Sequence, residues 1–134
     1  LTGFDIVKWQ IRIASGIPLN FTQDDVKLQG AAIECRINAA SCGTLSMLHV
    51  PGGPSVRFDT SLIEGTTVSP YYDSLLGKLI VFAKTREEAL RKIKAALCEL
   101  VIEGIPTNIE EQLNIVEDDR FTSGNYDLTF MSNR

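Results

Sequence analysis

AAIECRINAA, residues 31–40, alternates apolar and polar side chains along most of its length. Successive side chains of a β-strand point to opposite faces, so this stretch predicts a strand with one apolar and one polar face. The apolar face would contain Ala31, Ile33, Cys35, Ile37 and Ala39. The polar face would contain Glu34, Arg36 and Asn38, spaced about 6.6 Å apart along a rigid strand. We expect the first face to meet a hydrophobic core and the second to bind something polar.

Further short runs between residues 26 and 83 also have strand patterns. They are VKLQ (26–29), MLHV (47–50), SVRFD (55–59) and KLIVFA (78–83). Turn signals separate them, including PGGPS (51–55) and the region of Gly65. This succession of short strands and turns predicts a mostly antiparallel, barrel-sandwich-like sheet.

Helix patterns flank the predicted strands on both sides. The helical stretches are residues 4–14, 89–102 and 109–119. Their capping residues are Thr2 with Asp5, Thr85 with Glu88, and Asn108 with Glu111. We therefore predict an α+β fold, in one domain spanning residues 1–134, whose sheet is covered by an N-terminal helix and two C-terminal helices.

Composition excludes several classes of function. A net charge of −4 and a pI near 5.0 argue against a nucleic-acid-binding surface, which needs excess positive charge. No apolar run approaches the ~20 residues of a membrane helix. The three cysteines, Cys35, Cys42 and Cys98, are odd in number and form no CxxC pair, so neither a disulfide framework nor a metal site is predicted. We expect a cytoplasmic protein with reduced thiols, no membrane contact and no nucleic-acid partner.

Five segments, taken together, resemble one known family in their order and spacing. They are TGFDIVKWQIRIASGIPL (2–19), GAAIECRINA (30–39), HVPGGPSVRFDT (49–60), SPYYDSLLGKLIVFA (69–83) and LVIEGIPTNIE (100–110). This pattern is similar to the C-terminal domain of biotin carboxylases, the ATP-grasp subunits or domains of acetyl-CoA, propionyl-CoA and pyruvate carboxylases. The resemblance covers nearly the whole chain.

The resemblance implies a role for Arg36. The family uses ATP and bicarbonate to make carboxyphosphate, and the ureido nitrogen of biotin is then carboxylated. The arginine of the ECR motif, here Arg36, is expected to contact bicarbonate and biotin and to stabilise negative charge on the ureido oxygen. A guanidinium stays charged and presents a planar fork of donors. We interpret Glu34 and Asn38 as groups that hold its orientation, although a solvated row that pairs with neighbouring strands is the alternative for such residues.

Arg57 and Asp73 match positions that the family places at or near a subunit interface. They are candidate contacts of a homodimer, and the alternative is that each forms an ion pair within the chain. Pro54 and Ser55 stand where family members usually have an aromatic residue, which weakens the expected dimer. The loop after Ala39 is also shorter than in the family, by about seven residues.

Two other features invite a functional interpretation and do not support one. His49, the only histidine, has no serine or cysteine partner at triad spacing, so we interpret it as a strand residue with a satisfied ring. PGGPS lacks the lysine and the following Ser or Thr of a phosphate-binding loop, and it predicts a tight turn.

The resemblance also implies what this chain leaves to other parts of a carboxylase. ATP and Mg²⁺ would be bound by an ATP-grasp domain that the 134 residues do not contain. The expected partners are a biotin carboxyl carrier protein or domain and a carboxyltransferase component, as in acetyl-CoA carboxylase and fatty acid biosynthesis. We therefore expect a biotin carboxylase fragment that is inactive alone; the alternative is a stand-alone interaction module with the same fold. The acceptor, an acyl-CoA or a keto acid, is left open.

Overall fold

The computed structural model describes residues 1–133 and has an α+β fold. Its helices are α1 (Ile6–Ala14), α2 (Arg86–Glu99), α3 (Ile109–Glu117) and α4 (Asp119–Ser123), with short 3₁₀ turns at Gln23–Asp25 and Phe130–Asn133. Its strands are β1 (Ala31–Asn38), β2 (Gly43–Thr44), β3 (Met47–His49), β4 (Val56–Thr60), β5 (Thr67–Val68), β6 (Leu75–Ala83) and β7 (Val101–Glu103). The predicted fold class is confirmed.

Strand β6 lies at the centre of the main sheet, in the order β1-β6-β4. Two shorter sheets, β2-β5 and β3-β7, complete the strands, and every pairing among the described residues is antiparallel. Cys35 of β1 pairs with Leu79 of β6, which pairs in turn with Phe58 of β4. The alternation predicted for residues 31–40 is confirmed, because Ile33, Cys35 and Ile37 are buried while the residues between them are exposed.

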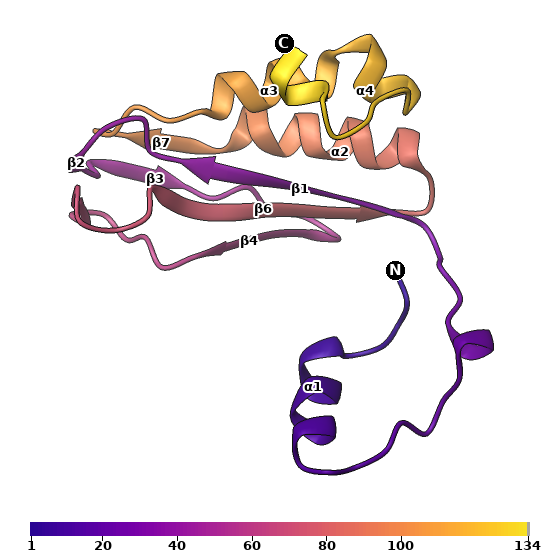
Figure 1. The fold of residues 1–134 in the computed structure, drawn as a ribbon. Helices are drawn as coiled ribbons and strands as arrows, with labels where there is room; N and C mark the ends of the chain where they lie inside the picture. Colours follow the sequence, from indigo (N-terminus) through magenta and orange to yellow (C-terminus); the bar gives the residue numbers. More distant parts are fainter. Residues whose placement is uncertain (134) are drawn as a thin grey trace.

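Helix α2 covers one face of this sheet. Its Ala89, Ile93, Ala96 and Leu97 are buried in the same cluster as Ile37, Leu79 and Val81. Figure 1 shows α2, α3 and α4 together on one side of the sheet that β1, β6 and β4 form. Within residues 1–133 no helix packs against the opposite face of β1, β6 and β4, which we call the open face.

The N-terminal helix forms as predicted but does not cover the sheet. Asp5 caps α1 by accepting a hydrogen bond from the Lys8 N–H at 2.9 Å. Figure 1 shows α1 on a separate arm below the sheet, and Ile6 and Val7 are each 65% exposed. Within the described residues, the ring contacts of this arm stay inside its own segment: Phe21 meets Phe4 and Trp9, and the Arg12 guanidinium lies over the Trp9 ring. The predicted position over the sheet is wrong, because within the described residues α1 has no buried face.

Two boundaries in the C-terminal half differ from the sequence prediction. The helix expected over residues 89–102 ends at Glu99, and Val101–Glu103 becomes β7, which pairs with β3. The strand pairing and the β-branched residues favour extended backbone there. Gly104 then takes a positive φ of 87°, and its missing Cβ leaves room for the carbonyl of Thr44.

In the N-terminal part of the chain, the strand predicted at residues 26–29 is absent, and this segment is irregular.

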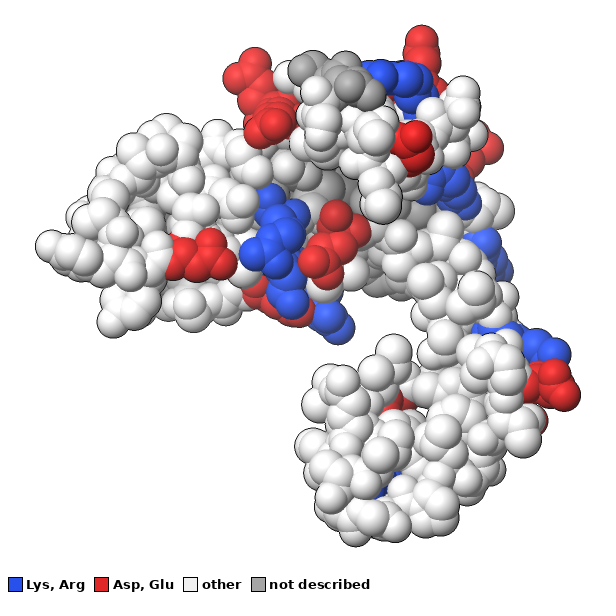
Figure 2. All heavy atoms as spheres, viewed as in Figure 1, with Lys and Arg blue, Asp and Glu red and all other residues white. Residues whose placement is uncertain are grey.

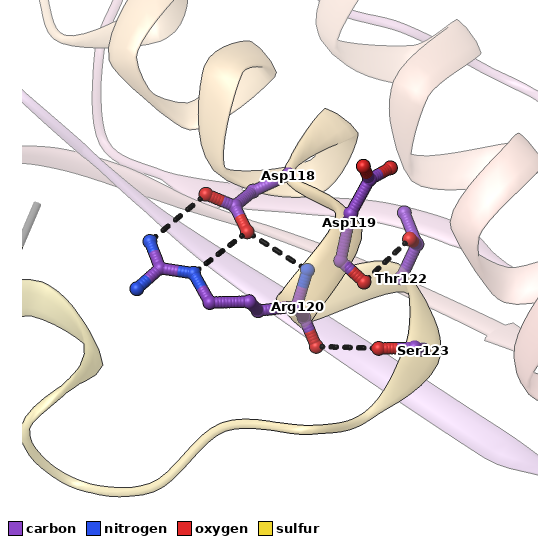
Figure 3. Close-up of polar contacts among 5 residues, drawn as sticks. All are labelled: Asp118, Asp119, Arg120, Thr122 and Ser123. Atoms are coloured by element: carbon purple, nitrogen blue, oxygen red, sulfur yellow. Dashed lines mark hydrogen bonds and ion pairs between the residues drawn. The ribbon is translucent and has the colours of Figure 1, made fainter.

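The helix expected over residues 109–119 is divided at Asp118. This residue has extended backbone, and its side chain caps α4 by accepting from the Arg120 N–H at 2.9 Å. Figure 3 shows the Arg120 guanidinium folded back onto the same carboxylate, at 3.1 and 3.2 Å. Hydrogen bonds from the Arg120 side chain hold the pKa of Asp118 below its usual value. This local capping explains why one predicted helix is two.

Candidate functional site

The open face carries cross-strand rows of polar side chains. In one row Arg36 of β1 lies opposite Lys78 of β6, which lies opposite Asp59 of β4. The next row places Glu34 opposite Ile80, and Ile80 opposite Arg57. Figure 2 shows basic and acidic atoms side by side over the middle of the strands, whereas the lower lobe that contains α1 shows few charged atoms in this view. The predicted polar face of β1 is therefore part of a larger charged surface.

Arg36 projects from the C-terminal half of β1 and is available to a ligand. Its side chain is 56% exposed, and its one ion pair within the described part of the chain joins Nη2 to Asp73 Oδ2 at 3.8 Å. A guanidinium has five N–H donors, and one long, solvated ion pair is a weak competitor for them. The backbone beneath it is firmly held, because Cys35 and Ile37 on either side are buried in the core. Arg36 can thus bind an anion without a large rearrangement.

Asp73 lies beside Arg36, although the sequence suggests separate roles for the two residues. One oxygen of Asp73, Oδ1, accepts a hydrogen bond from the Leu75 N–H at 3.2 Å and so holds the turn that leads into β6. The other oxygen faces Arg36. This is the intramolecular alternative that the sequence left open. A role of Asp73 at a subunit interface stays a prediction.

Arg57 also forms an intramolecular ion pair. Its Nε lies 2.9 Å from Asp59 Oδ1, two residues further along β4. Because both side chains lie on the open face, the pair is solvated, and the Arg57 side chain is 68% exposed. Arg57 is therefore accessible to another chain as well, and its predicted place in a dimer interface stays a prediction.

Glu34 and Asn38 differ in how they relate to Arg36. Glu34 is exposed and has no hydrogen bond or ion pair within the described residues, so a role in orienting Arg36 stays a prediction. Asn38 is partly buried, and its Oδ1 is shielded from solvent without a hydrogen-bond partner in that part of the chain. The β1–β6 register shifts between Ile37 and Asn38. Asn38 therefore lies directly after the irregularity in the β1–β6 pairing.

Asn108 was expected only to cap a helix, but it binds the strand that carries Arg36. Its Nδ2 donates to the Arg36 carbonyl oxygen at 3.1 Å, and its Oδ1 accepts from the Asn38 N–H at 2.8 Å. Its own backbone N–H donates to the Asn38 carbonyl oxygen at 3.2 Å. The side chain makes no capping hydrogen bond to α3, so the predicted capping box with Glu111 is wrong. The GIPTN motif was the signal that could have drawn attention to this residue.

Cys35 lies on the covered side of β1, directly below the polar row. Burial, and secondarily the charge of Glu34, raises the pKa of the Cys35 thiol to about 11. Cys42 and Cys98 are exposed free thiols. The thiol of Cys35 therefore acts as an apolar core group at neutral pH.

Other residues considered from the sequence lie away from this surface. His49 Nε2 lies 3.4 Å from Glu99 Oε1, in accord with a satisfied ring. Residues 51–55 form a turn before β4, with Ser55 at a positive φ of 60°, and no helix follows. Among residues 1–133 no group of three or more His, Cys, Asp or Glu side chains could hold a metal ion. No helix in that range is both long and apolar enough to cross a bilayer.

Comparisons with known proteins agree with this geometry. The family model for the biotin carboxylase C-terminal domain matches residues 34–133. The chain is 44% identical to the biotin carboxylase of Haemophilus influenzae, over 100% of this chain and 32% of that protein. That alignment has 141 positions against 134 residues, so it contains at least seven gap positions in this chain, which agrees in number with the shortening expected after Ala39.

Solved structures give the same result. The biotin carboxylase domain dimer of the Hydrogenobacter thermophilus 2-oxoglutarate carboxylase, in complex with MgADP, ADP and bicarbonate, matches with a TM-score of 0.91 and 41% identity, over 98% of this chain and 31% of that one. The biotin carboxylase subunit of pyruvate carboxylase matches with the same TM-score, identity and coverage. The chain thus spans about a third of the proteins it matches. It belongs to the family of biotin carboxylase C-terminal domains.

Proposed function

We propose that this chain is the C-terminal part of a biotin carboxylase and contributes Arg36 to the ATP- and bicarbonate-dependent carboxylation of carrier-linked biotin. The observation that carries the proposal is the setting of Arg36. Its backbone is fixed by buried neighbours, while its guanidinium is more than half exposed and makes one ion pair at 3.8 Å. A charged donor group held on a rigid strand suits an anionic reactant.

Arg36 would act on charge that develops during the reaction. Biotin, when bound, supplies the ureido nitrogen that accepts the carboxyl group. The guanidinium would hold bicarbonate and stabilise negative charge on the ureido oxygen, and donors aimed at such charge in a site with little water are worth about 3 kcal/mol each. Breaking the Arg36–Asp73 ion pair to bind the reactants would cost little free energy, because the pair is long and solvated.

The residues of this chain do not fit ATP or Mg²⁺. Residues 51–55 lead into β4, so they provide no helix N-terminus for phosphates. Within residues 1–133 there is no cluster of acidic groups for a metal ion. We therefore assign ATP and Mg²⁺ to an ATP-grasp portion of the whole protein and derive no phosphate-transfer step from this domain.

The partners follow from the same proposal. A biotin carboxyl carrier protein or domain would bring biotin to the open face, and a carboxyltransferase component would use the carboxylated product. We propose acetyl-CoA carboxylase, fatty acid biosynthesis and a cytoplasmic location as its setting. The matched proteins also belong to carboxylases of 2-oxoglutarate and pyruvate, so the acceptor is assigned by the carboxyltransferase and not by Arg36. A homodimer is proposed because one matched structure is a dimer.

The experiment compares this chain alone with a chimeric carboxylase, in which residues 1–134 replace the matching third of the Haemophilus influenzae biotin carboxylase. Both are assayed for carboxylation of free biotin and for bicarbonate-dependent ATP cleavage. We expect the chain alone to be inactive and the chimeric carboxylase to perform both steps. The unmodified relative, assayed in parallel, is the positive control.

Two results would contradict the proposal. ATP cleavage by the chain alone, dependent on Arg36, would show that the domain is more than a fragment. A folded chimeric carboxylase that cleaves ATP but leaves biotin unmodified would instead favour the stand-alone interaction module. Circular dichroism of each protein establishes that a negative result is not a failure to fold.

A further inference from the structure

We propose that Asn108 is a positioning residue for Arg36, and that its side chain fixes the edge of β1 at the point where the catalytic guanidinium must be aimed. This inference rests on the proposed function, because it assigns a second residue to the same reaction. The two side-chain hydrogen bonds from Asn108 to β1 are called the Asn108 bridge below.

The Asn108 bridge replaces a strand partner. β1 is an edge strand, since among the described residues its only neighbour in the main sheet is β6. The Arg36 carbonyl and the Asn38 N–H both lie on the free edge, where they would otherwise bond to water. The carboxamide of Asn108 satisfies both at once, at 3.1 and 2.8 Å, as a peptide group of another strand would. Arg36 is therefore held on both edges of β1.

The position of the bridge along β1 makes it important for Arg36. The register of the β1–β6 pairing shifts between Ile37 and Asn38, although Asn38 still pairs with Leu75 and the Ala39 N–H donates to the Ser74 carbonyl oxygen at 2.8 Å. The ladder is therefore irregular directly after Ile37, and it fixes the orientation of the strand near Arg36 less firmly than a regular pairing would. The bridge spans this point, because it joins Arg36 to Asn38. Without it, the strand could twist at the irregularity and turn the guanidinium away from the open face.

Helix α3 lacks the side-chain hydrogen bond that usually caps its N-terminus. Asn108 lies at the N-cap of α3, where an asparagine side chain normally accepts a hydrogen bond from the first turn. Here no such bond forms. The orientation of the carboxamide is set by its partners, since the Asn38 N–H requires an acceptor and the Arg36 carbonyl requires a donor. A residue needed only to cap α3 would not require both an acceptor and a donor directed at β1.

Chemistry distinguishes asparagine from its isostere at this position. An aspartate would still accept from the Asn38 N–H, but it would present an oxygen to the Arg36 carbonyl and repel it. Alanine would remove both hydrogen bonds. Asn114, on the exposed side of α3, has no hydrogen bond to β1 among the described residues and provides the matched control.

The first test uses the chimeric carboxylase, with Asn108→Ala and Asn108→Asp compared with Asn114→Ala and Asn114→Asp. We expect both Asn108 variants to lower kcat for biotin carboxylation about tenfold while bicarbonate-dependent ATP cleavage stays within about twofold, and the Asn114 variants to change neither. In an Arg36→Ala background, Asn108→Ala should cause no further loss, because it acts through Arg36. Equal losses in both steps, or an undiminished further loss without Arg36, would overturn the proposal.

The second test uses the 134-residue chain alone and does not depend on activity. In Asn108→Ala, NMR should show faster amide exchange at Asn38 and a shifted Arg36 Nε–H resonance, and Asn114→Ala should show neither. An unchanged Arg36 resonance would overturn the positioning role. If the chimeric carboxylase with native Asn108 and Arg36 fails to carboxylate biotin, the proposed function is refuted, and the NMR result still decides whether Asn108 positions Arg36.

Discussion

The two faces of β1 use neighbouring residues for opposite purposes. Cys35 and Ile37 are 3% and 0% exposed and belong to the core under α2. Arg36, between them, has a side chain that is 56% exposed, and it lies in a row of charged groups. One peptide bond thus separates a residue that stabilises the fold from a residue available for chemistry. The comparison teaches that the candidate site would owe its rigidity to the buried face of the strand.

The two faces of β1 also differ in how much their side chains contribute to the free energy of folding. Full burial of a side chain such as isoleucine contributes about 1.5–3 kcal/mol, whereas exposed ion pairs contribute about 0–1 kcal/mol. The Arg36–Asp73 and Arg57–Asp59 pairs belong to the second class. Substitutions on the two faces should therefore separate stability from function.

The largest effect on stability is expected for Ile37→Ala. Because Ile37 is completely buried, the lost apolar contacts and the cavity should lower the free energy of unfolding by about 3–4 kcal/mol. Arg36→Ala, the matched change on the open face, should alter it by less than about 0.5 kcal/mol. Urea denaturation of the chain measures both. Similar losses for the two variants would break the distinction between the faces.

A smaller effect is expected from the titration of Cys35. Its pKa is raised from 9.0 to about 11 in the folded chain, so the folded state keeps a proton that the unfolded state releases. Stability should be unaffected below pH 9 and should fall by about 2–3 kcal/mol as the pH rises from 9 to 11. Urea denaturation across this range tests the prediction.

The control for this titration is Cys35→Ala, which should remove that part of the pH dependence and leave the contribution of lysines and tyrosines. If the free energy of unfolding of Cys35→Ala depends on pH as it does in the native chain, the thiol is not buried on the covered face as described.

The smallest effect is expected for self-association through the open face. Arg57 and Asp73 are satisfied within the chain, and Pro54 replaces the usual aromatic anchor. For the 134-residue chain alone, we expect sedimentation at micromolar concentration to show a monomer or a weak dimer, with little change in Arg57→Glu. A tight dimer that Arg57→Glu disrupts would place this arginine at an interface after all.

The alternation of β1 was readable because both faces follow from its own residues. The same local signals also predicted that α1 and α2 are helices. They could not predict that α2 packs against the sheet while α1 lies apart from it, because burial depends on what each helix meets in space. The local pattern was insufficient again at residues 101–103, where pairing with β3 replaced the helix.

The site was predictable to a similar extent. Arg36 could be selected from the ECRIN motif, but its ion pair with Asp73 depends on the turn before β6. Asn108 lies 72 residues from Arg36 in the sequence, and its local context favoured an N-cap. Only the packing of α3 beside β1 shows that its side chain serves the strand. Contacts between distant segments were the part that the sequence could not supply.

The most direct test of the central claim is the ratio of two rates in the chimeric carboxylase with Arg36→Ala. If Arg36 acts on charge that develops on biotin, carboxylation of biotin should fall about a hundredfold while bicarbonate-dependent ATP cleavage falls far less. Arg36→Lys should restore only part of the loss, because an ammonium lacks the planar fork, and Arg91→Ala on α2 serves as the matched control. Equal losses of both rates would contradict the account, because they would assign Arg36 to folding or to bicarbonate capture alone, without a role in stabilising charge on biotin.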